Sequence, residues 1–404
     1  MKLLFLHPNF PAQFKAPCIE LASQEKHQIK FICQTHYGRA LKGVEKLVLK
    51  GDGSHENAQK SYKSEEDRSI FRSKAYRASF IELKNNAWHP DITICHSGWG
   101  CGVHLKEIWP KTYFISYLEW WFDVKSDLIS NLKINKYFQL KESSIQSLWT
   151  RNMPAALEMC TSDKIIAPTE WQKQQLPTIL KEQCIVVRDN INDKIFFPEP
   201  KKLSLSPVVT YGTRGMEAMR GFPQFIEILP VLLRKWPQLT IEIAGKDTVS
   251  YGGILPKEKS WKKWALGILE EEGIAQRVKW LDSMTLENYA NWLKQTWCHI
   301  YLTEPFVTSW SYIEASYCQI PMVASNTKGT MEFSHLSENT TLVNHNNQAE
   351  LLEAVSQKLR LSGNTNCASR VKPSIMQTRT LKKLKTNESN LASLIADLEA
   401  PTKI

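Results

Sequence analysis

Short apolar runs alternate with longer helical patterns along the whole chain. In the first half the apolar runs are continuous rather than alternating, a pattern typical of strands that helices cover on both faces. These predicted strands are Leu3–Leu6, Ile29–Cys33, Ile92–Cys95, Tyr113–Tyr117 and Lys164–Ala167. Helical patterns lie between them, such as Arg68–Asn86 and Lys141–Met159. The alternation predicts a parallel α/β sheet.

A second alternation of the same kind follows the segment Pro198–Pro207, whose prolines, charges and serines predict a linker. Its predicted strands are Val208–Tyr211, Thr240–Ala244, Val278–Leu281, His299–Leu302 and Met322–Ala324, and its predicted helices are Phe222–Lys235, Leu286–Gln295, one containing Ile313–Tyr317, and an amphipathic helix over Leu381–Leu398. We therefore predict two Rossmann-like domains, residues 1–198 and 208–380, with a linker at 199–207, a ligand cleft between them, and a C-terminal helix and tail at 381–404. A C-terminal helix that crosses back to the first domain is an option within this architecture.

Composition narrows the class of protein. The 404 residues are 42% hydrophobic and 23% charged and include 14 Trp, which excludes a disordered chain. The nine Cys form no CxxC pair, so we expect free thiols in a reducing compartment. The first apolar run stops at His7-Pro8, too short for a signal peptide or a membrane span. A cytoplasmic protein is expected, with peripheral contact to the inner membrane surface as an option.

Charge is uneven along the chain. The net charge is +10, and residues 1–203 hold 29 of the basic and 22 of the acidic residues. Basic residues cluster between positions 60 and 84 and are interleaved with Tyr62, Phe71 and Tyr76. This cluster is either a binding surface for a polyanion, such as a lipid-linked phosphate or nucleic acid, or a solvated helix with i,i+4 ion pairs. Its members are Lys60, Lys63, Arg68, Arg72, Lys74, Arg77 and Lys84.

A glycine-rich segment, YGTRGMEAMRG, lies directly after a predicted strand of the second half and before a predicted helix. Gly212 and Gly215 let the backbone approach a ligand closely. Arg214 and Arg220 can converge on a diphosphate, because guanidinium groups match phosphate oxygens. The alternative is a loop that carries two solvated arginines.

A second segment, Tyr301–Ala315, runs from the end of a strand through a loop rich in Ser and Thr to a helix that carries Glu314. Hydroxyls and N–H groups at a helix N-terminus form an anion site, and a carboxylate one turn later can accept from ribose hydroxyls. Without such a ligand, Glu304 and Glu314 would be ordinary loop and helix glutamates.

Two segments of the first half also follow predicted strands. His96-Ser-Gly-Trp-Gly100 offers a base or hydrogen-bond donor, although a structural histidine fits as well. Glu119-Trp120-Trp121 places a carboxylate beside indoles, as in a sugar platform, although adjacent Trp are also ordinary core residues. The chain has no P-loop, HExxH or GxSxG motif, so hydrolases of those types are not favoured.

Taken together, these segments resemble the retaining glycosyltransferases of family 4, which have the GT-B fold of two Rossmann-like domains. The chain is most similar to a bacterial branch that opens with LFLHPNFPAQF. Further matching segments are HSGWG at 96–100, APTEWQ at 167–172, RGME at 214–217, RGFPQF at 220–225 and PFVTSWSYIEA at 305–315.

The resemblance implies a metal-independent enzyme that transfers a sugar, with retention, from a nucleotide-diphosphate sugar, with UDP- and GDP-sugars favoured. It implies that the catalytic residues are Glu119, His96, Arg214 and Arg220. The donor-binding residues it implies are Gly212, Arg214, Gly215, Arg220, Glu304, Thr308, Ser309, Trp310, Ser311 and Glu314. On the acceptor side it implies Asn9, Phe10, Gly98, Trp99 and Trp120.

The chain departs from the family pattern at three places. Nine residues, not seven, separate Glu304 from Glu314. Glu119 stands near the position where many members have His, so that Glu119 or His96 would take that role. Asn190 stands where the family's HDGID segment has glycine. Asn is suited to replace glycine there because it tolerates a positive φ better than most residues do.

Three hypotheses about function follow. The first is transfer to a glycan, a lipid-linked phosphate or another anionic acceptor. The second is transfer to modified bases of DNA, which would need the base flipped out of the duplex. The third is an inactive glycosyltransferase-like chain that serves as a binding or partner subunit.

Overall fold

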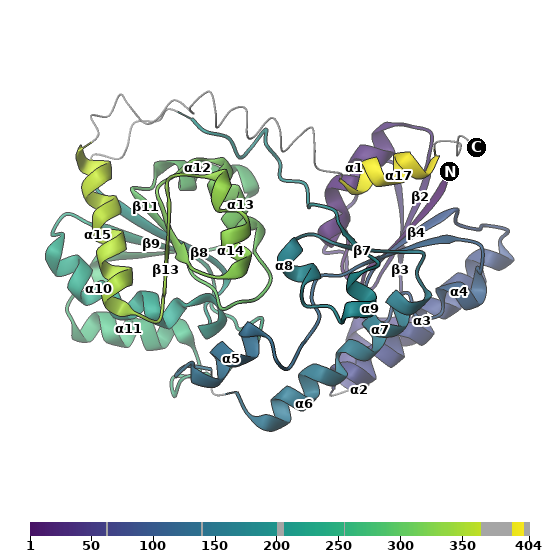
Figure 1. Ribbon diagram of the computed structural model, residues 1–404, viewed down its shortest axis with the longest axis horizontal. Coiled ribbons are helices and arrows are strands. Elements are labelled where there is room, and N and C mark those ends of the chain that lie inside the picture. The colour runs from purple at the N-terminus through teal and green to yellow at the C-terminus, as the bar shows by residue number, and fades with distance from the viewer. Residues whose placement is uncertain (62–63, 139, 200–205, 254, 365–389, 400–404) are drawn as a thin grey trace. The chain divides into compact units, whose positions relative to one another are not determined.

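The computed structural model describes residues 1–61, 64–138, 140–199, 206–253, 255–364 and 390–399 (Figure 1). The chain divides into two compact units. Unit 1 comprises Met1–Ser126, Glu142–Asn190 and Glu388–Ile404, and unit 2 comprises Asp127–Lys141 and Ile191–Asn387. Each unit contains one parallel sheet with helices on both faces, which is the predicted α/β architecture.

The sheet of unit 1 has seven strands in the order β3-β2-β1-β4-β5-β6-β7. Successive residues of β1 point to opposite faces, because a strand has a period of two. Leu3 and Phe5 pack in the cluster that contains α1, while Leu4 and Leu6 pack in the cluster that contains α3. The strands are β1 (Lys2–Leu6), β2 (Gln28–Cys33), β3 (Val44–Val48), β4 (Ile92–His96), β5 (Tyr113–Tyr117), β6 (Lys164–Ala167) and β7 (Cys184–Val186).

The helices of unit 1 follow the predicted alternation with one difference. The helix predicted over Lys141–Met159 is two helices, α6 (Glu142–Thr150) and α7 (Asn152–Thr161), which meet at Arg151. Ser64 caps the long helix α3 by accepting from the N–H of Asp67 at 3.0 Å. The remaining helices are α1 (Lys15–Ser23), α2 (His55–Ser61), α3 (Glu65–Asn85), α4 (Leu105–Ile108), α8 (Glu170–Lys173) and α9 (Thr178–Lys181).

The C-terminal helix returns to unit 1, as predicted. Helix α17 (Leu391–Glu399) lies beside α1 (Figure 1), and Leu391 and Ile395 are buried in the same cluster as Leu21. Lys26 forms an ion pair with Glu399 at 2.5 Å. The first part of the predicted helix, 381–389, lies outside the described residues.

The sheet of unit 2 has six strands in the order β10-β9-β8-β11-β12-β13. Its strands are β8 (Val208–Gly215), β9 (Thr240–Lys246), β10 (Val278–Leu281), β11 (Cys298–Tyr301), β12 (Met322–Ser325) and β13 (Thr340–Val343). Its helices are α5 (Asp127–Ile134), α10 (Phe222–Lys235), α11 (Trp261–Glu271), α12 (Leu286–Gln295), α13 (Trp310–Tyr317), α14 (Lys328–Glu332) and α15 (Gln348–Asn364).

Unit 2 includes one segment from the first half of the chain, Asp127–Lys141. Lys136 pairs with Glu227 of α10 at 2.7 Å, and Asp127 pairs with Lys328 of α14 at 2.9 Å. No sequence pattern predicted this excursion. The domain bounds drawn from the sequence assign the segment to residues 1–198, and those bounds stay a prediction.

Within the described part of the chain, no helix is long and apolar enough to cross a membrane. The cysteines described there are free thiols, and all of them except Cys160 are buried. Burial raises the pKa of Cys33 and of Cys184 to about 12, so these thiols stay protonated and unreactive near neutral pH.

Candidate functional site

The glycine-rich segment of unit 2 begins as strand rather than loop. Strand β8 continues to Gly215 and pairs with β9 past an irregularity between Gly212 and Gly215. The two strands approach closely there, since a Cβ on Gly245 of β9 would lie 2.1 Å from the carbonyl oxygen of Thr213 in β8, and a Cβ on Gly215 would lie 2.4 Å from that of Thr248, just after β9. Arg214, one residue earlier, is exposed to solvent at the end of the strand. The glycines therefore permit close strand pairing and leave Arg214 accessible.

Arg220 is buried, in contrast to the solvated loop residue of the alternative interpretation. Its Nη1 donates to Oγ1 of Thr303 at 3.0 Å, and its guanidinium lies 4.7 Å from the ring centroid of Tyr251. Gly221, which follows it, has φ +59°, and a Cβ there would lie 2.5 Å from Cβ of Leu302. The left-handed turn thus brings Arg220 to the end of β11, the strand adjacent to β8.

Glu217 lies between the two arginines and was missed by sequence reasoning. It is fully buried and accepts from the backbone N–H groups of Ser250 at 3.0 Å and Tyr251 at 2.9 Å. Burial raises the pKa of its carboxyl. These bonds hold the turn that carries the Tyr251 ring against Arg220. Glu217 therefore supports the position of Arg220.

The segment after β11 leads into helix α13. Ser309 is the N-cap residue, and its N–H donates to the hydroxyl of Tyr301 at 3.1 Å. The hydroxyl of Thr308 is buried and has no hydrogen-bond partner in the structure. Ser311 is partly exposed and Trp310 is 40% exposed. This segment therefore places hydroxyl groups beside a helix N-terminus, with those of Ser309 and Ser311 on partly exposed residues.

Glu314 lies in the second turn of α13. Burial raises the pKa of its carboxyl to about 7. Such a carboxyl ionises near neutral pH, and the ionised form is a strong hydrogen-bond acceptor. This environment fits the ribose-binding role that the family resemblance implies, and it differs from that of an exposed helix glutamate.

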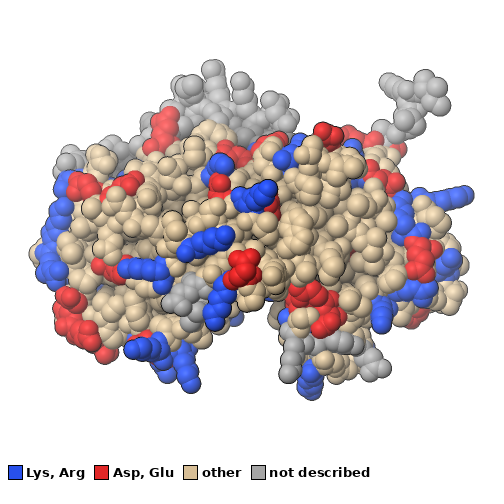
Figure 2. All heavy atoms as spheres, turned by 60° about the horizontal axis from the view of Figure 1, so that its bottom comes forward, with Lys and Arg blue, Asp and Glu red and all other residues tan. Residues whose placement is uncertain are grey.

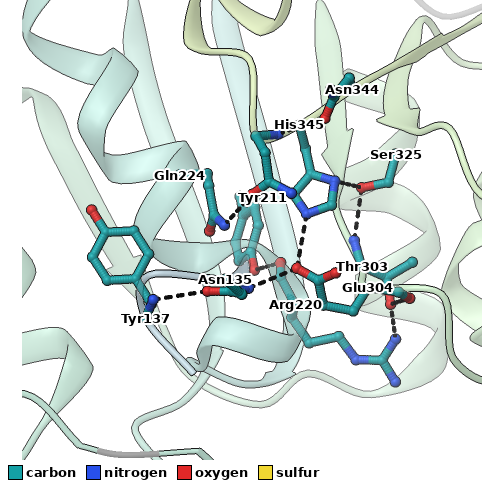
Figure 3. A network of polar contacts seen from close by, with 11 residues as sticks. Asn135, Tyr137, Tyr211, Arg220, Gln224, Thr303, Glu304, Ser325, Asn344 and His345 are labelled. Atoms are coloured by element: carbon teal, nitrogen blue, oxygen red, sulfur yellow. Dashed lines mark hydrogen bonds and ion pairs between the residues drawn. The ribbon is translucent and has the colours of Figure 1, made fainter. Parts of the chain in front are cut away.

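Glu304 lies at the centre of a polar network in unit 2 (Figure 3). Its side chain is fully buried, and its Oε1 lies 2.7 Å from Nδ2 of Asn135 and 3.3 Å from Nε2 of His345. His345 also contacts Ser325, whose Oγ accepts from the N–H of Thr303 at 2.9 Å. Sequence reasoning missed Asn135, His345 and Ser325, because each comes from a different segment and none lies in a recognisable motif. Thr303 lies within the segment Tyr301–Ala315, but its role beside Arg220 was also missed.

A second polar cluster gathers at the carboxyl ends of β1, β4 and β5 in unit 1. Glu119 accepts from Nε2 of Gln13 at 3.0 Å, and its other oxygen lies 3.5 Å from Nε2 of His96. His96 is buried and its ring lies 4.7 Å from that of His7. Burial and the neighbouring His96 hold the pKa of His7 well below its usual range, so His7 is neutral. The sequence analysis expected either Glu119 or His96 to take the role of the family's histidine, and in the structure the two side chains are neighbours.

The loop after β4 is held by Glu158 of α7, which sequence reasoning also missed. This fully buried carboxylate accepts from the N–H groups of Gly98 at 2.7 Å and Gly102 at 2.8 Å. Burial raises its pKa to about 7, against the lowering effect of these two bonds. The indole of Trp99 donates to Nδ1 of His96 at 3.1 Å. Glu158 thus shapes the loop that orients His96.

The other expected acceptor-side residues are spread around this cluster. The Asn9 side chain hydrogen-bonds with the hydroxyl of Thr35, and Trp120 packs its ring 5.9 Å from that of Trp171. Phe10 is fully buried with its ring 4.9 Å from Phe31, so its side chain is a core group and is closed to an acceptor.

Asn190 does not adopt a positive φ, so the conformational reason expected for its replacement of the family's glycine is wrong.

A small cavity of about 20 Å³ lies beside Gln13, Tyr117 and Asp189, large enough for a water molecule. The hydroxyl of Tyr117 donates to the carboxylate of Asp189 at 3.0 Å. The carboxylates of Glu119 and Asp189 therefore both lie just after strands of the sheet of unit 1, at the carboxyl ends of β5 and β7.

Two family models match the chain in succession. The model of the "Glycosyl transferase family 4 group" matches residues 25–196, and that of the "Glycosyl transferases group 1" matches residues 193–370. The chain belongs to the family 4-like, group 1 glycosyltransferases. No curated protein matches this glycosyltransferase in sequence.

Solved structures confirm the GT-B fold of this glycosyltransferase. A sucrose-phosphate synthase from Thermosynechococcus elongatus matches with a TM-score of 0.71 and 14% identity, covering 98% of each chain. A glycosyltransferase from Rickettsia africae matches with a TM-score of 0.63 and 14% identity, covering 98% of this chain and 97% of the other. A variant of S. aureus TarM in complex with Fondaparinux, alpha-GlcNAc-glycerol and UDP matches with a TM-score of 0.52 and 15% identity, covering 80% of this chain and 58% of the other.

The basic cluster of this glycosyltransferase does not form one exposed basic and aromatic strip. Arg72 is buried and bonds to Gln34, Glu65 and the carbonyl of Trp99. Tyr76 is fully buried, and Arg77 pairs with Glu107. Tyr62 and Lys63 lie outside the described residues. On the face drawn in Figure 2, basic and acidic side chains are interspersed. The paired helix of the alternative interpretation therefore fits better than a polyanion surface, although Arg72 and Tyr76 are buried rather than solvated.

Proposed function

We propose that this glycosyltransferase moves a sugar from a nucleotide-diphosphate sugar to an acceptor hydroxyl, with retention of anomeric configuration and without a metal ion. UDP- and GDP-sugars are the favoured donors. The observation that carries the proposal is the polar edge of unit 2. There the exposed Arg214 at the end of β8, the buried Arg220 and the N-terminus of α13 lie at the carboxyl ends of the adjacent strands β8 and β11. The TarM structure that contains UDP supports a nucleotide-diphosphate donor.

The charge on the leaving diphosphate is what such a site has to stabilise. Arg214 has an exposed guanidinium that can pair with phosphate oxygens, and Arg220 adds a fixed positive charge beside Thr303. The N–H groups at the start of α13 and the hydroxyls of Thr308 and Ser309 supply further donors. Glu314 would accept from the ribose hydroxyls. The two arginines supply positive charge, and the N–H groups and hydroxyls supply hydrogen-bond donors, so the proposed site does not call for a metal ion.

Retention requires that the acceptor attack the face from which the diphosphate leaves. In the proposed step, the C–O bond between the sugar and the phosphate breaks, and the acceptor oxygen bonds to the same anomeric carbon. The departing phosphate oxygen takes the acceptor's proton. Glu119 and His96 would orient the sugar hydroxyls, since a carboxylate and an imidazole can accept from and donate to them.

The acceptor is a hydroxyl compound. The interspersed charges of the helix α3 region provide no support for a DNA acceptor, and the carboxylates of Glu119 and Asp189 are suited to hydroxyl groups rather than to phosphates.

A thermal-shift panel of UDP, GDP, ADP, CDP and TDP tests the donor site. A ligand that binds only the folded state raises its melting temperature. We expect one nucleotide, at a concentration far above its Kd, to raise the melting temperature by several degrees. We expect Arg214→Ala to remove most of that shift, because the variant loses the exposed guanidinium.

The matched control is Arg234→Ala, an exposed arginine of α10 that pairs with Glu272. It should respond to the nucleotide like the unchanged protein. No shift with any nucleotide would refute the donor site. Binding without turnover of the matching nucleotide sugar would favour the inactive-subunit hypothesis. For an active enzyme, activity that survives EDTA and a product with the donor's anomeric configuration by NMR would support the remaining parts of the proposal.

A further inference from the structure

Arg220 is a buried cation whose hydrogen-bond and ring partners are uncharged. The residue is 7% exposed, and its Nη1 donates to Oγ1 of Thr303 at 3.0 Å (Figure 3). One face of its guanidinium lies over the ring of Tyr251, 4.7 Å from the centroid. Across the described part of the chain, Arg220 forms no ion pair with a carboxylate. A buried charge is costly unless an opposite charge pairs with it, so this arrangement suits an anionic ligand.

Tyr251 is held in place by groups other than Arg220. Its N–H donates to Oε2 of Glu217 at 2.9 Å, and the N–H of Ser250 donates to the same oxygen at 3.0 Å. Its ring meets that of Phe306 edge-on, with 5.2 Å between the centroids. The backbone and the ring of Tyr251 are therefore both fixed. A cation–π contact with a fixed ring restricts where the guanidinium can lie.

The turn that carries Tyr251 lies against Phe138, a residue from the first half of the chain. Gly252 and Gly253 follow Tyr251 with φ of +97° and +105°. A Cβ on Gly253 would lie 3.1 Å from Cδ2 of Phe138, and one on Gly252 would lie 3.9 Å from its Cζ. Phe138 is 9% exposed, so its ring packs closely against the backbone of this turn. Glycine is suited to both positions, since it adopts a positive φ and leaves room for the ring.

The residue before Phe138 attaches it to unit 2. The ring of Tyr137 lies 5.8 Å from that of Trp261 and 5.9 Å from that of Trp264, both in α11. The hydroxyl of Tyr137 also hydrogen-bonds to Glu227 of α10. The excursion from the first half of the chain therefore gives the glycine-containing turn a fixed support within unit 2.

We propose that Tyr251 and Phe138 are positioning residues for the diphosphate of the donor. Phe138 supports the turn, the turn holds the ring of Tyr251, and the ring fixes Arg220, so that its charge is in place before the diphosphate arrives. A charge that is already oriented stabilises an anion without the cost of reorganisation. This inference rests on the proposed function and deepens it, because it makes the donor site of unit 2 depend on a segment from the first half of the chain.

The test separates the diphosphate from the rest of the nucleotide. Calorimetry gives the affinity of the unchanged protein and of Tyr251→Leu for the nucleoside diphosphate that stabilises the protein, and competition against it gives the affinity for the parent nucleoside. We expect Tyr251→Leu to bind the diphosphate roughly 3- to 30-fold more weakly, as for a lost cation–π contact. Its affinity for the nucleoside should stay within about twofold, because Arg220 acts on the phosphates.

Further variants separate the ring and its support from folding in general. Tyr251→Phe keeps a ring over Arg220 and should bind the diphosphate like the unchanged protein. Phe138→Ala removes the support of the turn and should weaken binding of the diphosphate without weakening that of the nucleoside. Ile134→Ala, at a position of the same segment that is 79% exposed, should leave both affinities unchanged. Should Phe138→Ala fail to fold, the Tyr251 variants decide alone.

Three outcomes would overturn the inference, and they can be told apart. If Tyr251→Leu binds the diphosphate as tightly as the unchanged protein, the ring does not position Arg220, and the proposed function stands without it. If Tyr251→Leu and Phe138→Ala lose affinity for the nucleoside and the diphosphate equally, the two residues have a purely structural role. If the unchanged protein binds no nucleoside diphosphate, the proposed function fails and this inference fails with it.

Discussion

Several charged side chains of this glycosyltransferase are buried and hydrogen-bonded because of neighbours that lie far away in sequence. Glu158 and Glu217 are buried carboxylates whose hydrogen bonds go to backbone N–H groups of loops. Arg72 belongs to a stretch rich in basic residues, yet it is buried and bonded on all sides. In each case the residue type alone predicts a solvated side chain, and the tertiary contacts decide otherwise.

Glu158 provides a prediction at this scale. In Glu158→Ala the N–H groups of Gly98 and Gly102 lose their acceptor while the loop remains buried. We expect the free energy of unfolding to fall by at least about 2 kcal/mol, measured by urea denaturation. Glu20→Ala, at an exposed position of α1, should change it by less than about 0.5 kcal/mol. Equal effects of the two substitutions would contradict the role given to Glu158.

Glu314 predicts a pH dependence of nucleotide binding. Burial raises its pKa to about 7, and in the proposed contact the ribose hydroxyls donate to the ionised carboxylate. We therefore expect calorimetry to find the nucleotide bound about tenfold more weakly at pH 6 than at pH 8, because the proton must first leave. Glu314→Gln should bind more weakly at pH 8 and lose this dependence.

The same shift affects stability in a definite direction. Because the folded pKa lies above the ordinary value of 4.5, the folded chain binds more protons than the unfolded chain between pH 4.5 and about 7. The contribution of Glu314 to stability is thus greatest below pH 4.5 and is lost as the pH rises to about 7.

For the nucleotide-binding prediction, an affinity that stays constant from pH 6 to pH 8 would contradict the proposed contact with Glu314.

At the scale of elements, the interior strands and the edge strand β10 were predicted well, and the other edge strands poorly. The continuous apolar runs of β1, β4 and β5 are buried on both faces, which is why their pattern is clear. Strands β3, β7 and β13 were missed. They lie at sheet edges, so they are shorter or half-exposed and their pattern is weak. The helix predicted over Phe222–Lys235 is confirmed as α10.

Helix α17 provides a prediction at the scale of elements. Ile395 is fully buried in the cluster of unit 1 that contains α1. We expect Ile395→Ala to lower the free energy of unfolding by about 2–5 kcal/mol in thermal or chemical denaturation, as a cavity-forming substitution does. Leu398→Ala changes a residue that is 37% exposed and should cost less than about 1 kcal/mol. A small effect of Ile395→Ala would mean that α17 contributes little to unit 1.

For the whole molecule, the contacts regroup the chain across the order of its sequence. Residues 388–404 join unit 1, and Asp127–Lys141 joins unit 2. The first regrouping agrees with the expected option that the C-terminal helix crosses back to the first domain. The second was not predicted, because the segment Asp127–Lys141 shows no unusual pattern and its partners, Glu227, Glu304 and Lys328, come much later in the chain.

The amino-acid sequence by itself determined the α/β class, the two sheets, the positions of most strands and the segments that surround the candidate sites. It could do so because strand burial and close backbone approach leave local patterns of apolar residues and glycine. Only the tertiary structure decided which polar groups meet: Glu119 with Gln13 and His96, and Glu304 with Asn135 and His345. Hydrogen bonds between distant segments depend on angstrom-scale positions, and these positions are set by the packing of the whole unit rather than by any local pattern.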